Sequence, residues 1–191
     1  MTLPATLAVN AWTGNGAAAT SPLGPGAVAW ALGQGPAVPP RWLAPAAEVP
    51  RTEWRNPAVG WGLVLPDADG LDDAAKARGE DAPEPLRRLL ADREGAPVLR
   101  YVDDPRLRFT HVRRDFPDRP PVTLALSGSA CGLAPDRLPF YLLIAAGPES
   151  IPWDFQYIAG QSRPTGRLPL TGKALENYVA ALLTDWDGAA T

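Results

Sequence analysis

The chain has 191 residues, of which 46% are hydrophobic and 20% are charged, and its net charge is −3. This length suits one domain with its own core, and the weak negative charge argues against binding to nucleic acid or to an anionic membrane surface. Cys131 is the only cysteine and His111 the only histidine, which excludes an internal disulfide and a multi-thiolate zinc site. The longest apolar run, residues 140–146, is too short to span a membrane. We therefore expect a cytoplasmic protein without a cofactor.

Residues 1–50 form a distinct compositional block with eight prolines, six glycines and two charged residues. This block also contains Trp12, Trp30 and Trp42, whereas disordered linkers are poor in aromatic residues. We predict an extended arm that packs on the domain surface, and the alternative is an arm that docks on a partner. The predicted boundaries are residues 1–50 for the arm and residues 51–191 for the domain.

The first half of the domain has a strand–helix–strand pattern. Residues 60–66 predict a buried strand closed by a proline, and the polar residues 67–81 predict an exposed segment. A helix is expected to open at residues 83–85 and to end at Gly95, and residues 98–102 form the next predicted strand. This order is typical of a βαβ unit and hence of a parallel sheet.

The second half adds further strands and one long helix. Alternating residues predict a short half-exposed strand over 107–112, and residues 122–126 predict another. The continuously apolar residues 140–146 indicate a central parallel strand, buried on both faces. Apolar residues recur at helical spacing over 171–186, with Thr171 as the N-cap. The sequence thus predicts an α/β fold with a mainly parallel sheet flanked by helices.

The segment after this central strand is a candidate binding site. We read it as a loop beyond the carboxyl end of a parallel strand, where ligand sites of α/β folds form. Its aromatic residues would line a pocket or partner surface, or would simply cap the core. With one basic residue that follows later in the chain, the candidate site residues are Trp153, Asp154, Phe155, Gln156, Tyr157 and Arg167.

His111 and Cys131 are a second, separate candidate. A cysteine becomes a nucleophile when a base or a positive charge stabilises its thiolate, and a histidine is able to supply both. The flanking sequence of Cys131 is rich in small residues, as in a nucleophile turn. The structural alternative is a small buried thiol and a surface histidine.

An ordered series of motifs resembles a known family. Residues 54–57 and 60–66 precede the series, which consists of Phe140-Tyr141-Leu142-Leu143-Ile144, Gly147-Pro148-Glu149-Ser150-Ile151-Pro152, Phe155-Gln156-Tyr157 and Gly166-Arg167-Leu168-Pro169. This segment resembles bacterial caspase-like cysteine peptidases of the gingipain and CHAT type, closely over residues 140–168 and more loosely over 54–186. The resemblance implies a caspase-like, Rossmann-like α/β fold.

The resemblance also places the expected catalytic residues outside the matched segment. In that family the catalytic histidine and cysteine lie downstream, and neither motif follows Trp186, while His111 and Cys131 match no family position. We therefore expect the N-terminal, non-catalytic portion of such a peptidase, inactive alone. Its partner would be a peptide or protein, including the remaining catalytic part of the same protein or another chain. The alternatives are a standalone regulatory or protein-binding module, and a small cysteine hydrolase that uses His111 and Cys131.

Overall fold

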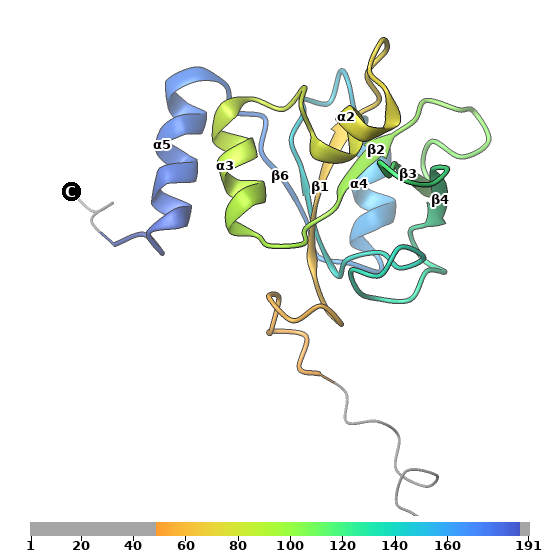
Figure 1. Ribbon diagram of the computed structural model, residues 1–191, viewed down its shortest axis with the longest axis horizontal. Coiled ribbons are helices and arrows are strands. Elements are labelled where there is room, and N and C mark those ends of the chain that lie inside the picture. Colours follow the sequence, from red (N-terminus) through yellow and green to blue (C-terminus); the bar gives the residue numbers. More distant parts are fainter. Residues whose placement is uncertain (1–48, 188–191) are drawn as a thin grey trace, which may run out of the picture. The chain divides into compact units, whose positions relative to one another are not determined.

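The computed structural model describes residues 49–187, so the predicted arm lies outside the described residues apart from its last two. These residues form a six-stranded sheet in the order β4-β3-β2-β1-β5-β6 (Figure 1). Helices cover both faces of the sheet (Figure 1). In chain order the elements are β1 (Trp61–Pro66), α2 (Asp73–Arg78), α3 (Glu84–Asp92), β2 (Val98–Tyr101), β3 (His111–Arg114), β4 (Val122–Ala125), β5 (Tyr141–Ile144), α4 (Trp153–Gly160), β6 (Thr165–Arg167) and α5 (Gly172–Leu183).

The sheet is mixed, with a parallel part and an antiparallel hairpin. Strand β1 pairs in parallel with β2 and β5, and β5 pairs in parallel with β6. Strands β3 and β4 are antiparallel to their neighbours. Residues 102–110 are too few for the helical crossover that a parallel strand needs, so the chain turns back after β2. The predicted α/β class and the βαβ unit are confirmed, and the hairpin is the departure from an all-parallel sheet.

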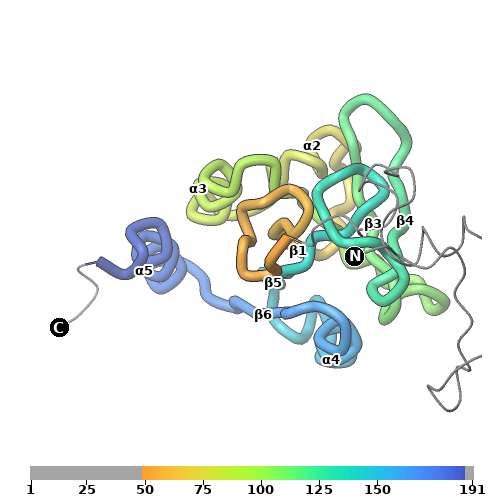
Figure 2. Tube along the Cα trace, turned by 90° about the horizontal axis from the view of Figure 1, so that it is seen from below, coloured from red at the N-terminus to blue at the C-terminus, as the bar shows by residue number. Residues whose placement is uncertain are grey.

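Two apolar cores lie on the two faces of the sheet. Helix α4 covers one face, where Phe155 packs with Val64 of β1 and Tyr101 of β2. Helices α3 and α5 cover the other face and pack against Leu63 and Leu65 of β1. Figure 2 shows α4 on the side of the sheet opposite to α3 and α5. Because successive strand residues face opposite sides, both faces of β1 are buried, as its apolar sequence predicts.

The segment 67–81, predicted to be exposed, is exposed in part and contains a short helix. Residues 73–78 form helix α2, in which the Asp72 side chain accepts a hydrogen bond from the Ala75 amide at 2.7 Å. The helix ends at Gly79, whose φ of 64° is left-handed. A six-residue helix is too short for a periodic signal. Within this segment Lys76 and Asp67 form an ion pair, whereas Asp69 and Asp73 are exposed.

The segment 153–157 is helical, whereas the sequence suggested a loop. Pro152 precedes the first turn of α4 with a φ of −57°, a value suited to helix entry. Phe155 and Ala159 are one turn apart and fully buried, so they form the apolar stripe of this helix. The sequence contains this stripe, but it is too narrow to distinguish a helix from a loop.

Several predicted elements have shifted boundaries. The strand expected over 140–146 spans Tyr141–Ile144 and is fully buried only at alternate positions. The strand expected over 107–112 begins at His111, because the preceding residues form a turn in which the Leu107 amide donates to the Asp104 carbonyl at 2.9 Å. The helix expected over 171–186 ends at Leu183, and Trp186 lies beyond it with a left-handed φ of 65°. Thr171 precedes this helix, but its side chain makes no capping hydrogen bond.

Between residues 49 and 187, no helix combines the length and apolar character needed to cross a membrane.

Phe155 is the best test of this packing. Its side chain is 0% exposed and meets Tyr101 edge-on at 5.3 Å between ring centroids. We expect Phe155→Ala to lower the free energy of unfolding by about 3–5 kcal/mol, because the lost ring leaves a cavity. Tyr157→Ala on the same helix, where the side chain is 66% exposed, should change it by less than about 0.5 kcal/mol. Urea unfolding followed by tryptophan fluorescence measures both, and equal losses would contradict the assignment of faces.

Candidate protein-binding site

The turn after β5 directs the chain into α4 at the carboxyl edge of the sheet. The amides of Ser150 and Ile151 both donate to the Gly147 carbonyl, at 3.2 and 3.1 Å. Ile151 is fully buried in the core under α4, which fixes the turn to the sheet. The N-terminus of α4 is therefore set close to the end of β5, where the sequence predicted a site.

Arg167 joins β6 to this turn and to α4. Its guanidinium donates to the Ala146 carbonyl at 2.9 Å, to the Pro152 carbonyl at 3.3 Å and to Gln156 Oε1 at 2.8 Å. It also lies over the ring of Trp153, at 4.7 Å from the centroid. Burial lowers the pKa of Arg167 below its ordinary value, and the charge of Glu149 acts in the opposite direction. Arg167 therefore has a structural role, because its hydrogen bonds to the turn and to α4 already occupy its guanidinium.

The remaining predicted site residues separate into a core residue and a surface. Phe155 belongs to the core, whereas Asp154 is exposed. Trp153 and Tyr157, one turn apart on α4, are 48% and 66% exposed and stack with ring centroids 6.3 Å apart. Trp153, Tyr157 and the stacked Arg167 therefore form an open aromatic surface instead of an enclosed pocket.

His111 and Cys131 have different polar partners in this structure. His111 Nδ1 lies 2.8 Å from Thr110 Oγ1, and the Cys131 sulfur lies 3.4 Å from a guanidinium nitrogen of Arg163. Between residues 49 and 187 no hydrogen bond joins the two candidate residues to each other. The catalytic pair thus stays a prediction, with no contact that supports it.

Arg163 is the buried residue that organises the surroundings of Cys131. Its guanidinium donates to the carbonyls of Leu126, Leu138 and Pro139 at 3.0–3.1 Å and also to the Ser129 carbonyl. Backbone carbonyls are the main partners of this charge, together with the Cys131 sulfur. These bonds hold the long connection between β4 and β5 against the end of α4. The Cys131 segment is therefore a fixed part of the fold.

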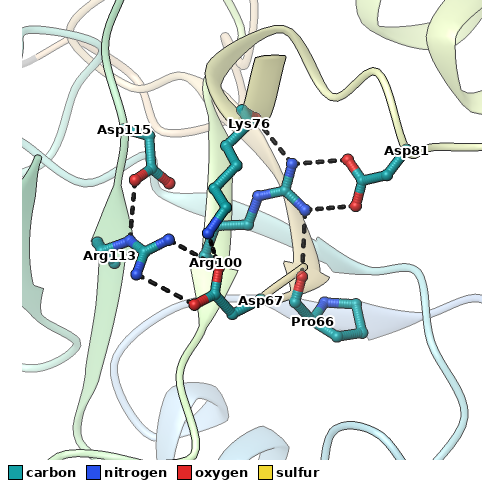
Figure 3. Close-up of polar contacts among 7 residues, drawn as sticks. All are labelled: Pro66, Asp67, Lys76, Asp81, Arg100, Arg113 and Asp115. Atoms are coloured by element: carbon teal, nitrogen blue, oxygen red, sulfur yellow. Dashed lines mark hydrogen bonds and ion pairs between the residues drawn. The ribbon is translucent and has the colours of Figure 1, made fainter. Parts of the chain in front are cut away.

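A second buried guanidinium lies where β1 and β2 end. Arg100 of β2 is 0% exposed and donates to both Asp81 oxygens, at 2.6 and 2.7 Å (Figure 3). It also donates to the Lys76 carbonyl of α2 at 2.8 Å and to the Pro66 carbonyl of β1 at 3.1 Å. Burial alone would raise the pKa of Asp81, but the hydrogen bonds and charge of Arg100 outweigh it and lower that pKa.

The adjacent charges form a chain of ion pairs. Asp67 accepts from Lys76 at 2.8 Å and from Arg113 at 2.7 and 3.1 Å, and Arg113 also donates to Asp115 at 2.8 Å (Figure 3). Burial opposes the ionisation of Asp67, yet Lys76 and Arg113 lower its pKa below the ordinary value. Burial raises the pKa of Asp115, whose second oxygen has no hydrogen-bond partner within the described chain.

The charges of this ion-pair network indicate a structural role. Its cations and anions neutralise one another, and no group of His, Cys, Asp or Glu side chains among the described residues is arranged to hold a metal ion. The sequence contains a signal for it, because Arg100 interrupts the apolar residues 98–102 of a strand predicted to be buried. A charge in that position requires a partner, but the identity of the partner, Asp81, is not evident from the spacing.

Removal of the Asp81 charge tests the network. Because its pKa is lowered on folding, Asp81 contributes stability above its ordinary pKa, and this contribution is lost as pH falls toward the lowered value. We expect Asp81→Asn to lower the free energy of unfolding by about 2 kcal/mol at pH 7. This loss is smaller than that expected on breaking a fully buried ion pair, because 26% of the Asp81 side chain is exposed. The difference in free energy of unfolding between the variant and the unmodified chain should become smaller below about pH 4.

Glu84→Gln is the matched control for this prediction. Glu84 pairs with Arg87 at 2.6 Å, but the two side chains are 64% and 46% exposed. This substitution should cost less than about 0.5 kcal/mol in the same urea titrations between pH 3 and pH 7. If Asp81→Asn costs no more than Glu84→Gln at pH 7, Arg100 does not depend on its carboxylate partner.

The chain matches no family model, no curated protein and no solved structure. The functional inference therefore depends on the aromatic surface of Trp153, Tyr157 and Arg167 and on the motif resemblance within residues 140–168.

Proposed function

We propose that this chain is the non-catalytic scaffold portion of a caspase-like cysteine peptidase and that it does not hydrolyse peptides by itself. The proposal is supported by the way in which residues 140–168, the segment that resembles this family, fold as one unit. Residues 140–168 include β5, α4 and β6, which follow one another directly and occupy one end of the sheet. This segment is thus a complete βαβ unit, the kind of element on which a parallel sheet is extended.

The surroundings of Cys131 support inactivity of the isolated chain. Peptide hydrolysis by a cysteine also needs a residue that transfers a proton to the leaving amine. The polar side chain next to the Cys131 sulfur is Arg163, whose guanidinium is not deprotonated in proteins and therefore does not transfer that proton. His111, the candidate base, is hydrogen-bonded to Thr110.

A standalone protein-binding module is the second candidate function. It is favoured by the exposed stack of Trp153 and Tyr157, because aromatic residues of this kind are enriched at protein interfaces. Genomic sequence past Thr191 discriminates between the two candidates. A reading frame that continues into His-Gly and Cys motifs supports the peptidase scaffold, and a frame that stops supports the module.

The direct test is hydrolysis by the purified 191-residue chain. With labelled casein and a mixed peptide library as substrates, we expect no release of product above the rate of a buffer control. Cys131→Ala should leave this background unchanged, because the thiol lacks an activating base. Hydrolysis that is lost in Cys131→Ala and retained in the neighbouring control Ser129→Ala would overturn the scaffold proposal in favour of a cysteine hydrolase.

A further inference from the structure

Strand β6 ends the sheet with an unpaired backbone edge. The Leu142 amide donates to the Pro164 carbonyl at 3.0 Å, and the Leu168 amide donates to the Ile144 carbonyl at 2.8 Å. In a parallel ladder this pattern directs residues 164, 166 and 168 toward β5. The backbone N–H and C=O groups of Thr165 and Arg167 therefore point away from the sheet. No described strand pairs with them, since β6 is the last strand in the order.

Large exposed apolar side chains occur in the segments that precede and follow this strand. Four such residues occur among the described residues, and all four belong to the segment that forms α4, β6 and α5: Trp153, Tyr157, Leu170 and Trp186. Trp153 and Tyr157 lie on the α4 side, next to Arg167 of β6. Leu170 and Trp186 line a groove of about 610 Å3 along α5 on the other side. Figure 2 shows β6 at the end of the sheet, with α4 and α5 on its two sides.

The opposite edge of the sheet is protected differently. Edge strands are commonly shielded by prolines and by free charges, which discourage pairing with another chain. Strand β4 follows Asp118, Arg119 and two consecutive prolines, and no large exposed apolar residue lies beside it. In β6 the one charged side chain, Arg167, is folded inward onto carbonyls and therefore leaves its backbone accessible. Strand β6 also lies between two prolines, Pro164 and Pro169, so the two edges differ in their exposed apolar residues and in the inward placement of Arg167 and not in their prolines.

The rim of this surface is acidic. Three exposed carboxylates lie at this surface: Glu149, whose charge acts on Arg167; Asp154, next to Trp153; and Asp187, which lines the α5 groove. The exposed ammonium group of the same segment is that of Lys173. Two copies of this surface would repel each other, whereas a strand with basic flanks would be attracted. The charge pattern therefore favours a different polypeptide over a second copy of this chain.

We propose that β6 receives an added β-strand from a partner polypeptide with apolar residues at alternate positions and basic residues on its flanks. Alternate side chains of an added strand point to opposite faces of a sheet. One set would contact Trp153 and Tyr157, the other would contact Leu170 and the α5 groove, and the main chain would bond to Thr165 and Arg167. This inference depends on the proposed function only in requiring a polypeptide partner, and it applies equally to a peptidase scaffold and to a binding module.

The test uses the full chain and a synthetic nine-residue probe in which valine and threonine alternate between terminal lysines. Fluorescence anisotropy should show binding, and Trp153→Lys should weaken it by at least about tenfold because it replaces an apolar contact with a charge. Ala91→Lys, at an exposed position of α3, is the matched control and should leave affinity unchanged. Equal weakening by both substitutions would mean that the lysine probe senses overall charge and would overturn the proposal.

Two N-methylated forms of the probe separate strand addition from simple hydrophobic contact. In an added strand, alternate amides face β6, so methylation of one alternating set should abolish binding and methylation of the other set should be tolerated. This comparison leaves the protein unaltered, so a folding defect of a variant does not affect it. Equal affinity of the two forms, absence of binding by the parent probe, or stable dimers of the chain without probe would each overturn the proposal. None of these outcomes depends on whether the chain hydrolyses peptides.

Discussion

The burial of a guanidinium group in the sheet is the constraint on which the rest of this fold depends. Arg100 lies inside a strand whose other residues are apolar, and its charge has no contact with water. An isolated charge in that environment would be strongly unfavourable. Its two terminal nitrogens donate to the Asp81 carboxylate and to the carbonyls of Pro66 and Lys76, while Nε has no partner among the described residues. Strand β1, helix α2 and the loop before α3 are thereby all fixed to β2.

The same chemistry recurs twice at the other end of the molecule. Arg163 binds the carbonyls of the β4–β5 connection, and Arg167 binds those that follow β5 and precede α4. Arginine suits this role because its planar group offers five donors in fixed directions. By turning inward, Arg167 also removes the charge that would otherwise shield β6. The interaction that holds the edge in place is therefore the one that leaves it open.

The sequence predicts most of the elements, and for physical reasons it predicts few of the contacts. Apolar runs identify β1 and β5, and β2 is identified from its other apolar residues although Arg100 interrupts them, because parallel strands under helices are mostly apolar. Helices α2 and α4 are missed because six and eight residues are too few to establish a helical period. The partners of Arg100 and Arg163 are not predictable from spacing, since they are largely backbone carbonyls brought near by the fold.

The candidate site follows the same division between local pattern and tertiary contact. Its location after β5 is predictable, because parallel strands present their carboxyl ends at one edge of a sheet. Which of its residues are buried is not predictable in the same way. Helix α4 directs Phe155 into the core and Tyr157 toward solvent. Of the alternatives expected for this segment, a pocket, a partner surface or a cap of the core, the structure has Phe155 in the core and Trp153 and Tyr157 on an exposed surface.

Amide hydrogen exchange of β6, measured residue by residue in the full chain, tests the central claim most directly. If β6 is an open edge, the amides of Thr165 and Arg167 should exchange rapidly, while that of Leu168, bonded to the Ile144 carbonyl, should be protected. Addition of the alternating peptide probe should then slow the exchange of Thr165 and Arg167 selectively. Protection of these two amides in the free chain, equal to that of Leu168, would show that the edge is already covered and would contradict the account.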